Sequence, residues 1–98
     1  MNRNEAEILL EELESLIGDR PGRNESRLFR CREIIEQILY GQTDAYLREK
    51  ASTASEFLGI WFSPRKWQKF GSADQMRHLV RMDVGSFEMA LDQHFRER

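Results

Sequence analysis

The sequence predicts an all-α protein, a compact array of five to six short helices that forms a single domain over residues 1–98. Two observations lead to this prediction. Wherever apolar residues recur regularly, they recur at the spacing of a helix, and residues that favour helix starts and stops lie at the ends of these segments. Because most of the expected helices are short, we expect an orthogonal array rather than four long parallel helices.

The first helix is expected over residues 4–17 and should end at Gly18, a residue that readily takes the conformation of a helix stop. Residues 18–24 contain two glycines and a proline, so they should form an exposed loop that is open to proteolysis. The apolar positions of the first helix recur three and four residues apart and should be buried: Ala6, Leu9, Leu10, Leu13, Leu16 and Ile17.

The second helix is expected from Glu25 to about Tyr40. Asn24 or Ser26 can cap its start, and Gly41 can close its end in the left-handed conformation. One face of this helix is apolar and should be buried: Leu28, Cys31, Ile35, Ile38 and Leu39, with Ile34 widening the stripe.

The third helix should lie at the centre of the fold, because apolar residues cover more than one side of it. Thr43 and Asp44 provide its cap. Its end stays open at this point, since Gly59 can be a C-terminal cap or a small residue inside a helix that continues to Phe62. The buried side is marked by Leu47, Ala51, Ala54, Leu58 and Trp61.

Three shorter helices are expected in the last third of the chain. A proline in the first helical position starts one over residues 64–70, capped by Ser63. Ser72 and Gln75 have the spacing of a capping box, so a second should begin at the next residue and be interrupted at Gly85. The buried positions of the last two helices are Met76, Leu79, Val80, Phe87, Ala90, Leu91 and either His94 or Phe95.

The composition excludes several classes of protein. With 15 basic and 17 acidic residues, no field of the whole molecule attracts nucleic acid or an anionic membrane. The first twenty residues contain two basic and six acidic residues, which is typical of a solvated acidic helix face. No segment is apolar enough to span a membrane or to act as a signal peptide, and the single cysteine cannot form an internal disulfide. We therefore expect a soluble, cytoplasmic protein with no membrane partner.

The sequence offers little support for catalysis. Cys31, His78 and His94 lie in separate segments, so neither a metal nor another cofactor is expected. Helical periodicity turns Cys31 into the core, where a thiol is unreactive. The paired carboxylates Glu11, Glu12 and Glu14 belong to the polar side of the first helix, where water keeps their pKa values ordinary. We expect no enzyme, although residues distant in sequence can still converge in the fold.

The most informative stretch is LGIWFSPRKWQKFG, residues 58–71, which combines aromatic and basic side chains. Trp61 and Phe62 should close the central helix and belong to the core. Trp67 and Phe70 are three residues apart and should both pack against the third helix. The predicted function is a small helical protein–protein interaction module, an adaptor or regulatory subunit, and its partner-binding residues are Arg65, Lys66, Trp67 and Lys69.

Nucleic-acid binding is the alternative function. Residues 73–97 have apolar positions that resemble those of a helix-turn-helix with its turn at Gly85, and the basic cluster at 65–69 would assist. The pattern departs from that motif at Ser86, and Glu88 and Asp92 would face a polyanion. A homo-oligomer is favoured over a monomer, because apolar residues lie outside the buried stripes of the second and third helices: Phe29, Ile34, Tyr46 and Phe57.

Overall fold

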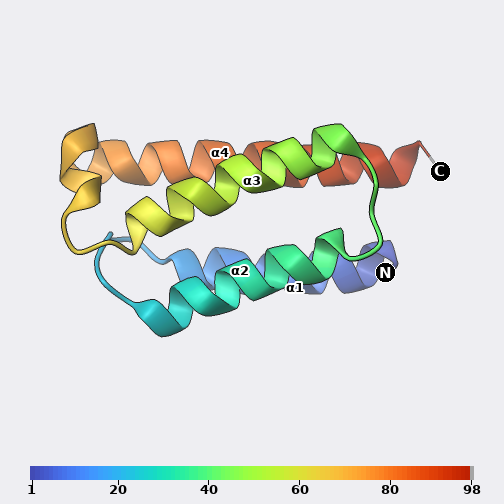
Figure 1. Ribbon diagram of the computed structural model, residues 1–98, viewed down its shortest axis with the longest axis horizontal. Coiled ribbons are helices and arrows are strands. Elements are labelled where there is room, and N and C mark those ends of the chain that lie inside the picture. The colour runs from blue at the N-terminus through green and yellow to red at the C-terminus, as the bar shows by residue number, and fades with distance from the viewer. Residues whose placement is uncertain (98) are drawn as a thin grey trace.

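The computed structural model describes residues 1–97. They form four α-helices and one short 3-10 helix, namely α1 (Arg3–Ile17), α2 (Glu25–Leu39), α3 (Ala45–Trp61), η1 (Lys66–Phe70) and α4 (Ala73–Arg96). Successive α-helices run in alternating directions, with α1 and α2 in one layer and α3 and α4 in the other (Figure 1). The molecule measures 40 × 22 × 18 Å. The all-α prediction is confirmed, whereas the orthogonal array of five to six helices is wrong, because the chain forms an elongated four-helix bundle.

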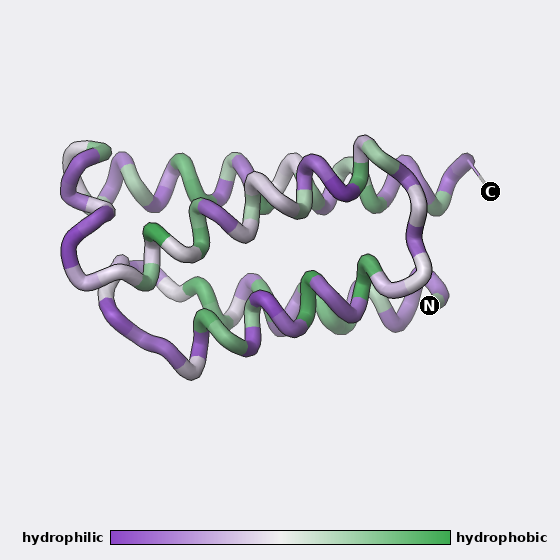
Figure 2. The backbone as a smooth tube through the Cα atoms, viewed as in Figure 1, coloured by the Kyte–Doolittle hydropathy of each residue, from purple (hydrophilic) through white to green (hydrophobic). Residues whose placement is uncertain are grey.

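The two ends of the bundle differ in what they contain. At one end, which we call the η1 end, η1 lies above the loop of residues 18–24; the other, the terminal end, holds both chain ends and the loop of residues 40–44 (Figure 1). In Figure 2 apolar and polar residues alternate along each helix, whereas the loops at the η1 end are mostly polar. The η1 end is therefore formed mainly by polar loop residues that lie outside the four α-helices.

Each α-helix begins at a side-chain cap. The predicted caps Asn24, Asp44 and Ser72 are confirmed, and Asn2 caps α1 in the same way. The side-chain oxygens of these four residues accept backbone N–H groups three residues later, at Arg27 (3.0 Å), Leu47 (3.1 Å), Gln75 (3.2 Å) and Glu5 (2.9 Å). At the opposite ends of α1 and α2, Gly18 and Gly41 take positive φ angles of 68° and 75°, as expected for glycine after a helix.

The break predicted at Gly85 is absent, because α4 is one continuous helix through this residue. Apolar residues at helical spacing on both sides of Gly85 are buried in the same core: Met76, Val80, Val84, Phe87 and Leu91. A glycine inside a helix costs only about 1 kcal/mol relative to alanine, less than the burial of even one of these side chains contributes. Burial of this apolar face thus keeps α4 continuous, so one helix forms where the sequence predicted two.

Helix α3 continues through Gly59 to Trp61, which resolves the open question about its end. A Cβ atom at Gly59 would stand 2.7 Å from a guanidinium nitrogen of Arg32, so the glycine gives this side chain room to lie on α3. All five residues predicted for the inner side of α3 are buried, which confirms its central position: Leu47, Ala51, Ala54, Leu58 and Trp61. None of the helices formed by residues 1–97 is long and apolar enough to cross a membrane.

Candidate functional site

The candidate site is the η1 end, and Trp61 anchors the chain that leads into it. The Trp61 side chain is fully buried, and its Nε1–H donates a 2.8 Å hydrogen bond to the carbonyl oxygen of Ile17 at the end of α1. The Trp61 carbonyl oxygen accepts a 3.0 Å hydrogen bond from the N–H of Gly22 in the loop of residues 18–24. Phe62 is also buried, so the prediction that both aromatic residues belong to the core is confirmed. These contacts fix the point at which the chain leaves the core and continues toward η1.

The segment after Phe62 forms a single 3-10 turn. The predicted helix at 64–70 starts instead at Lys66, and the residue before it is Arg65, which makes no side-chain cap hydrogen bond, so the prediction that Ser63 is the N-cap is wrong. The Ser63 hydroxyl still accepts a 3.2 Å hydrogen bond from the Lys66 N–H. Residues 62–72 connect α3 to α4, and five of them form η1. The side chains of η1 therefore point in different directions around a short 3-10 helix.

The two aromatic residues of η1 contact different parts of the bundle. The Phe70 ring packs edge to face on Phe57 of α3, with centroids 5.9 Å apart, and stays 39% exposed. Trp67 is half-buried in a shallow cleft between the loop of residues 18–24 and the start of α4, lined also by Arg20 and Arg77. Trp67 also packs against the buried core, so its predicted contact with α3 beside Phe70 stays a prediction.

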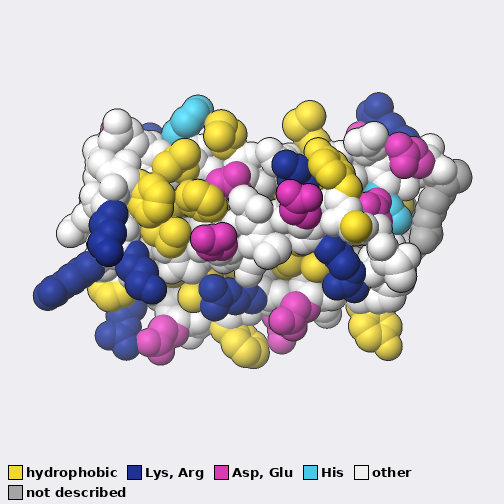
Figure 3. Space-filling view, turned by 45° about the horizontal axis from the view of Figure 1, so that its top comes forward, with side chains coloured by type: hydrophobic (Ala, Val, Ile, Leu, Met, Phe, Trp, Pro, Cys, Tyr) yellow, Lys and Arg dark blue, Asp and Glu magenta, His cyan; other side chains and the backbone are white. Residues whose placement is uncertain are grey.

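The three cations in and next to η1 are exposed. Arg65, Lys66 and Lys69 form no ion pair with any residue in 1–97. Figure 3 shows basic side chains gathered at the η1 end. Other arginines of the chain do have carboxylate partners: Arg3, Arg23, Arg30, Arg77, Arg81 and Arg96. The predicted cluster of cations is therefore brought together, with Trp67 beside it in the cleft.

Charge is distributed unequally along the bundle. Residues 18–24 and 62–77, which build the η1 end, contain six basic and two acidic residues, although the whole chain has a net charge of −2. The remainder of the protein consequently carries an excess of negative charge. The nearly equal numbers of basic and acidic residues in the whole chain conceal this polarity. It appears only when the fold brings residues 18–24 and 62–77 to one end of the bundle.

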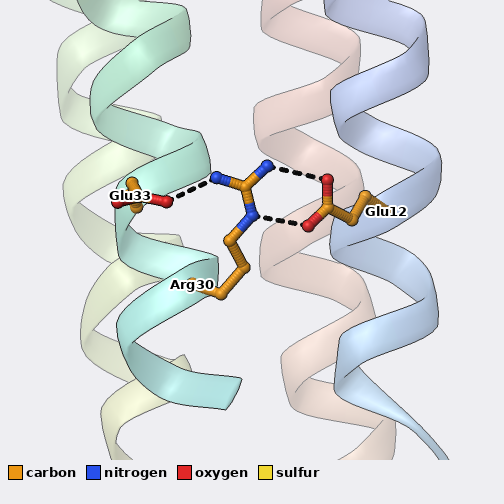
Figure 4. Close-up of polar contacts among 3 residues, drawn as sticks. All are labelled: Glu12, Arg30 and Glu33. Atoms are coloured by element: carbon orange, nitrogen blue, oxygen red, sulfur yellow. Dashed lines mark hydrogen bonds and ion pairs between the residues drawn. The ribbon is translucent and has the colours of Figure 1, made fainter. Parts of the chain in front are cut away.

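The acidic face of α1 is only partly solvated. Glu12 accepts two hydrogen bonds from Arg30 of α2, at 2.5 and 2.8 Å, and Arg30 also binds Glu33 at 2.5 Å (Figure 4). The Arg30 guanidinium lowers the pKa of Glu12, and the two carboxylates raise the pKa of Arg30. Glu14 pairs with Arg81 of α4 at 3.1 Å. Two of the glutamates expected in water thus join α1 to its neighbours.

A pair of carboxyl groups that the sequence analysis missed lies in the seam between α1 and α4. Glu88 is half-buried, and its Oε1 atom has no hydrogen-bond partner within the described part of the chain. Burial, together with a hydrogen bond to Glu14 and the charge of that residue, raises the pKa of Glu88 to about 8. The available signal was spacing, since Arg81, Glu88 and Asp92 fall on one side of a continuous α4. These two groups can share a proton.

The histidines and the cysteine are not gathered into a site. His94 Nδ1 lies 3.2 Å from Asp44 Oδ2, while His78 is exposed elsewhere on α4. The Leu47 N–H and His94 lower the pKa of Asp44. Burial raises the pKa of Cys31 to about 11, and its predicted place in the core is confirmed. Residues 1–97 contain no group of three or more side chains that could hold a metal ion.

No protein-family model, curated protein or solved structure matches this chain.

Proposed function

We propose that the chain is a small helical protein–protein interaction module, an adaptor or regulatory subunit, that binds an acidic surface of a partner through the η1 end. Arg65, Lys66 and Lys69 make the electrostatic contacts, and Trp67 supplies an apolar contact beside them. One observation carries the proposal, namely that these three cations are exposed together without a carboxylate partner among residues 1–97. An unpaired cluster of this kind attracts an oppositely charged surface and orients it.

The way in which η1 is held supports this proposal. Phe70 packs on Phe57, Trp67 is partly buried against the core, and the Trp61 hydrogen bonds fix the entry of the chain. A segment that is already ordered loses less conformational entropy when it binds. The exposed part of Phe70 adds an aromatic contact next to the cations, a combination that is common at protein interfaces.

The alternative, binding of nucleic acid through residues 73–97, loses its structural basis. A helix-turn-helix needs a turn between two helices, and α4 runs straight through Gly85. Glu88 lies in the seam with α1. What remains for this alternative is the basic cluster itself, which a phosphate backbone would also attract, so the experiment must separate the two kinds of partner.

The test is affinity capture from a nuclease-treated lysate, followed by reversal of charge. We expect a protein captured by the wild type to be lost with Lys66→Glu/Lys69→Glu, and its binding to weaken as salt is raised. The matched control is Arg32→Glu/Lys50→Glu, which changes the net charge equally but lies on α2 and α3. The Lys66→Glu/Lys69→Glu variant should keep nearly the wild-type melting temperature, because both side chains are exposed. The control should lose slightly more, because Lys50 is half-buried over the Tyr46 ring.

Two results would overturn the proposal. Retention of the captured protein by the Lys66→Glu/Lys69→Glu variant would show that the cluster is only a solvated corner. A partner that is captured from an untreated lysate but not from a nuclease-treated one would show that nucleic acid, rather than protein, occupies the η1 end.

A further inference from the structure

The cleft between the loop of residues 18–24 and the start of α4, which we call the Trp67 cleft, has an apolar lining. Pro21, Trp67 and Ala73 contribute apolar atoms to it, and its volume is about 820 Å³. Trp67 is half-buried and lines the open space, so part of its indole remains available to a partner. The cleft is large enough to receive an apolar side chain.

The walls of the Trp67 cleft are joined to each other and to the core. Arg77 donates a 3.0 Å hydrogen bond to the Asp74 carboxylate and a 3.4 Å hydrogen bond to the Asp19 carbonyl oxygen, which connects α4 to the loop. The N–H of Gly22 in the same loop donates to the Trp61 carbonyl oxygen at 3.0 Å. A partner therefore meets a cleft that is already formed, which lowers the entropy lost on binding.

Arg20 adds a fourth unpaired cation to the three in and next to η1. It lines the Trp67 cleft, is exposed and forms no ion pair with any residue in 1–97. Arg23, three residues later in the same loop, is instead bound to Glu25 at 2.7 Å. Of these two arginines, Arg20 is therefore the one that is free to bind a carboxylate of a partner at the cleft.

The carboxylates of the η1 end do not cancel this positive charge. Asp74 is bound to Arg77 at 3.0 Å. Asp19 is the other acidic residue in the segments 18–24 and 62–77, and it stands against four cations without a carboxylate partner among residues 1–97: Arg20, Arg65, Lys66 and Lys69. The excess of positive charge favours a partner segment that carries carboxylates, and the apolar lining favours an apolar side chain among them.

We propose that the Trp67 cleft takes up an apolar side chain from an acidic segment of a partner protein. The carboxylates on either side of that residue bind Arg20 and the cations in and next to η1. This inference rests on the function proposed above and specifies which part of a partner the η1 end recognises. Charge attracts and orients the segment, whereas the apolar side chain in the cleft distinguishes it from other acidic surfaces.

The first test compares three synthetic peptides by fluorescence anisotropy with the whole chain. One peptide has glutamates on both sides of a central leucine, the second has glycine in place of the leucine, and the third has lysine in place of the glutamates. We expect the leucine peptide to bind about tenfold more tightly than the glycine peptide, because it buries much of an apolar side chain. The lysine peptide should bind weakest.

The outcomes separate this inference from the function on which it rests. Equal affinity for the leucine and glycine peptides, both bound more tightly than the lysine peptide, would overturn the role of the cleft and leave the binding of acidic surfaces intact. Failure of the glutamate peptides to bind more tightly than the lysine peptide would overturn both.

Variants of the cleft locate the leucine. Trp67→Ala should remove the difference in affinity between the leucine and glycine peptides while the glycine peptide binds as before. Ala73→Leu fills the cleft without changing Trp67 and should have the same effect, so the result does not depend on the stability of one variant. Phe29→Ala, which removes a 71% exposed ring on α2, is the control and should keep the difference. A difference that survives in both cleft variants would overturn the proposal.

The role of Arg20 has a matched control in its own loop. Arg20→Glu should weaken binding of both glutamate peptides several-fold, because it places a carboxylate beside theirs. Arg23→Glu makes the same change in charge three residues away, at a side chain already bound to Glu25, and should weaken them less. An equal loss in the two variants would show that only the net charge of the loop matters and would overturn the contact assigned to Arg20.

Discussion

Helices α3 and α1 are held in the bundle by different kinds of contact. Five residues of α3 are buried in the core, and α3 packs closely along α4. Only Ala6, Leu13 and Ile17 of α1 are buried, but three ion pairs join α1 to its neighbours: Glu12–Arg30, Glu14–Arg81 and Arg3–Asp92. Burial of apolar surface stabilises α3, whereas α1 combines a thin apolar stripe with charge pairing.

This difference explains how a strongly acidic helix fits into the bundle. The glutamates of α1 would repel the acidic residues of α4 if no cations lay between them. Arg30 of α2 and Arg81 of α4 approach α1 from its two sides and bind Glu12 and Glu14. These partly exposed pairs add little free energy, but they determine which faces of α1 turn toward its neighbours.

The largest effect should follow from a change at Trp61, where α3 contacts α1. Trp61→Ala removes a fully buried indole and its hydrogen bond to Ile17, so we expect a loss of about 3–5 kcal/mol in the free energy of unfolding. Trp61→Phe keeps most of the ring and should cost less. Urea denaturation measures both variants. If Trp61→Ala cost no more than a typical surface substitution, α3 would not be the central helix.

The α1–α4 seam makes a prediction about pH. The pKa of Glu88 is raised to about 8 in the folded chain from an ordinary value of 4.5. The folded state therefore holds a proton that the unfolded state releases in this range, and the free energy of unfolding falls as pH rises from about 4.5 to about 8. Glu88→Gln removes this contribution. Because the group is only half-buried, we expect the variant to gain about 1–2 kcal/mol on the wild type toward the upper end of the range.

Chemical denaturation at several pH values within that range provides the measurement. Glu11→Gln, which removes a charge from the exposed side of α1, is the control and should keep the slope of the wild type. The same slope in Glu88→Gln would mean that Glu88 is solvated and that the seam is not a site of proton sharing.

Local signals predicted the helices better than their assembly. Caps at Asn24, Asp44 and Ser72 depend on residues a few positions away, and the inner side of α3 follows from its period. The break at Gly85 was predicted wrongly because a glycine was given more weight than the continuous apolar stripe around it. Ile34, which widens the apolar stripe of α2, is fully buried, so it does not belong to an exposed patch with Phe29.

The sequence predicted only the part of the candidate site whose residues are neighbours in the chain. Arg65, Lys66 and Lys69 are neighbours in sequence, so their cluster was visible without a structure. Glu14 and Glu88 are separated by most of the chain, and their contact depends on the angle between α1 and α4. Likewise, no local pattern places Trp67 beside the loop of residues 18–24.

A smaller effect should come from Gly85 in α4, the helix that contacts both α1 and α3. Since α4 is helical there and a Cβ atom would meet nothing within 4 Å, Gly85→Ala should stabilise the protein by about 0.5–1 kcal/mol. Thermal denaturation measures this change as a shift in the melting temperature. A lower melting temperature would indicate that α4 needs a flexible point, as the predicted turn required.

The smallest effect is expected at Arg30, which joins α1 to α2. Arg30→Lys keeps the charge but cannot make the paired hydrogen bonds to Glu12 together with the bond to Glu33. We expect a slightly lower melting temperature at low salt and a smaller difference at high salt, because exposed charges are screened. Arg23→Lys is the control, since its partner Glu25 is two residues away and no second helix is involved. An equal loss in both variants would show that the pairing of α1 with α2 rests on apolar contacts alone, as the packing of α3 does.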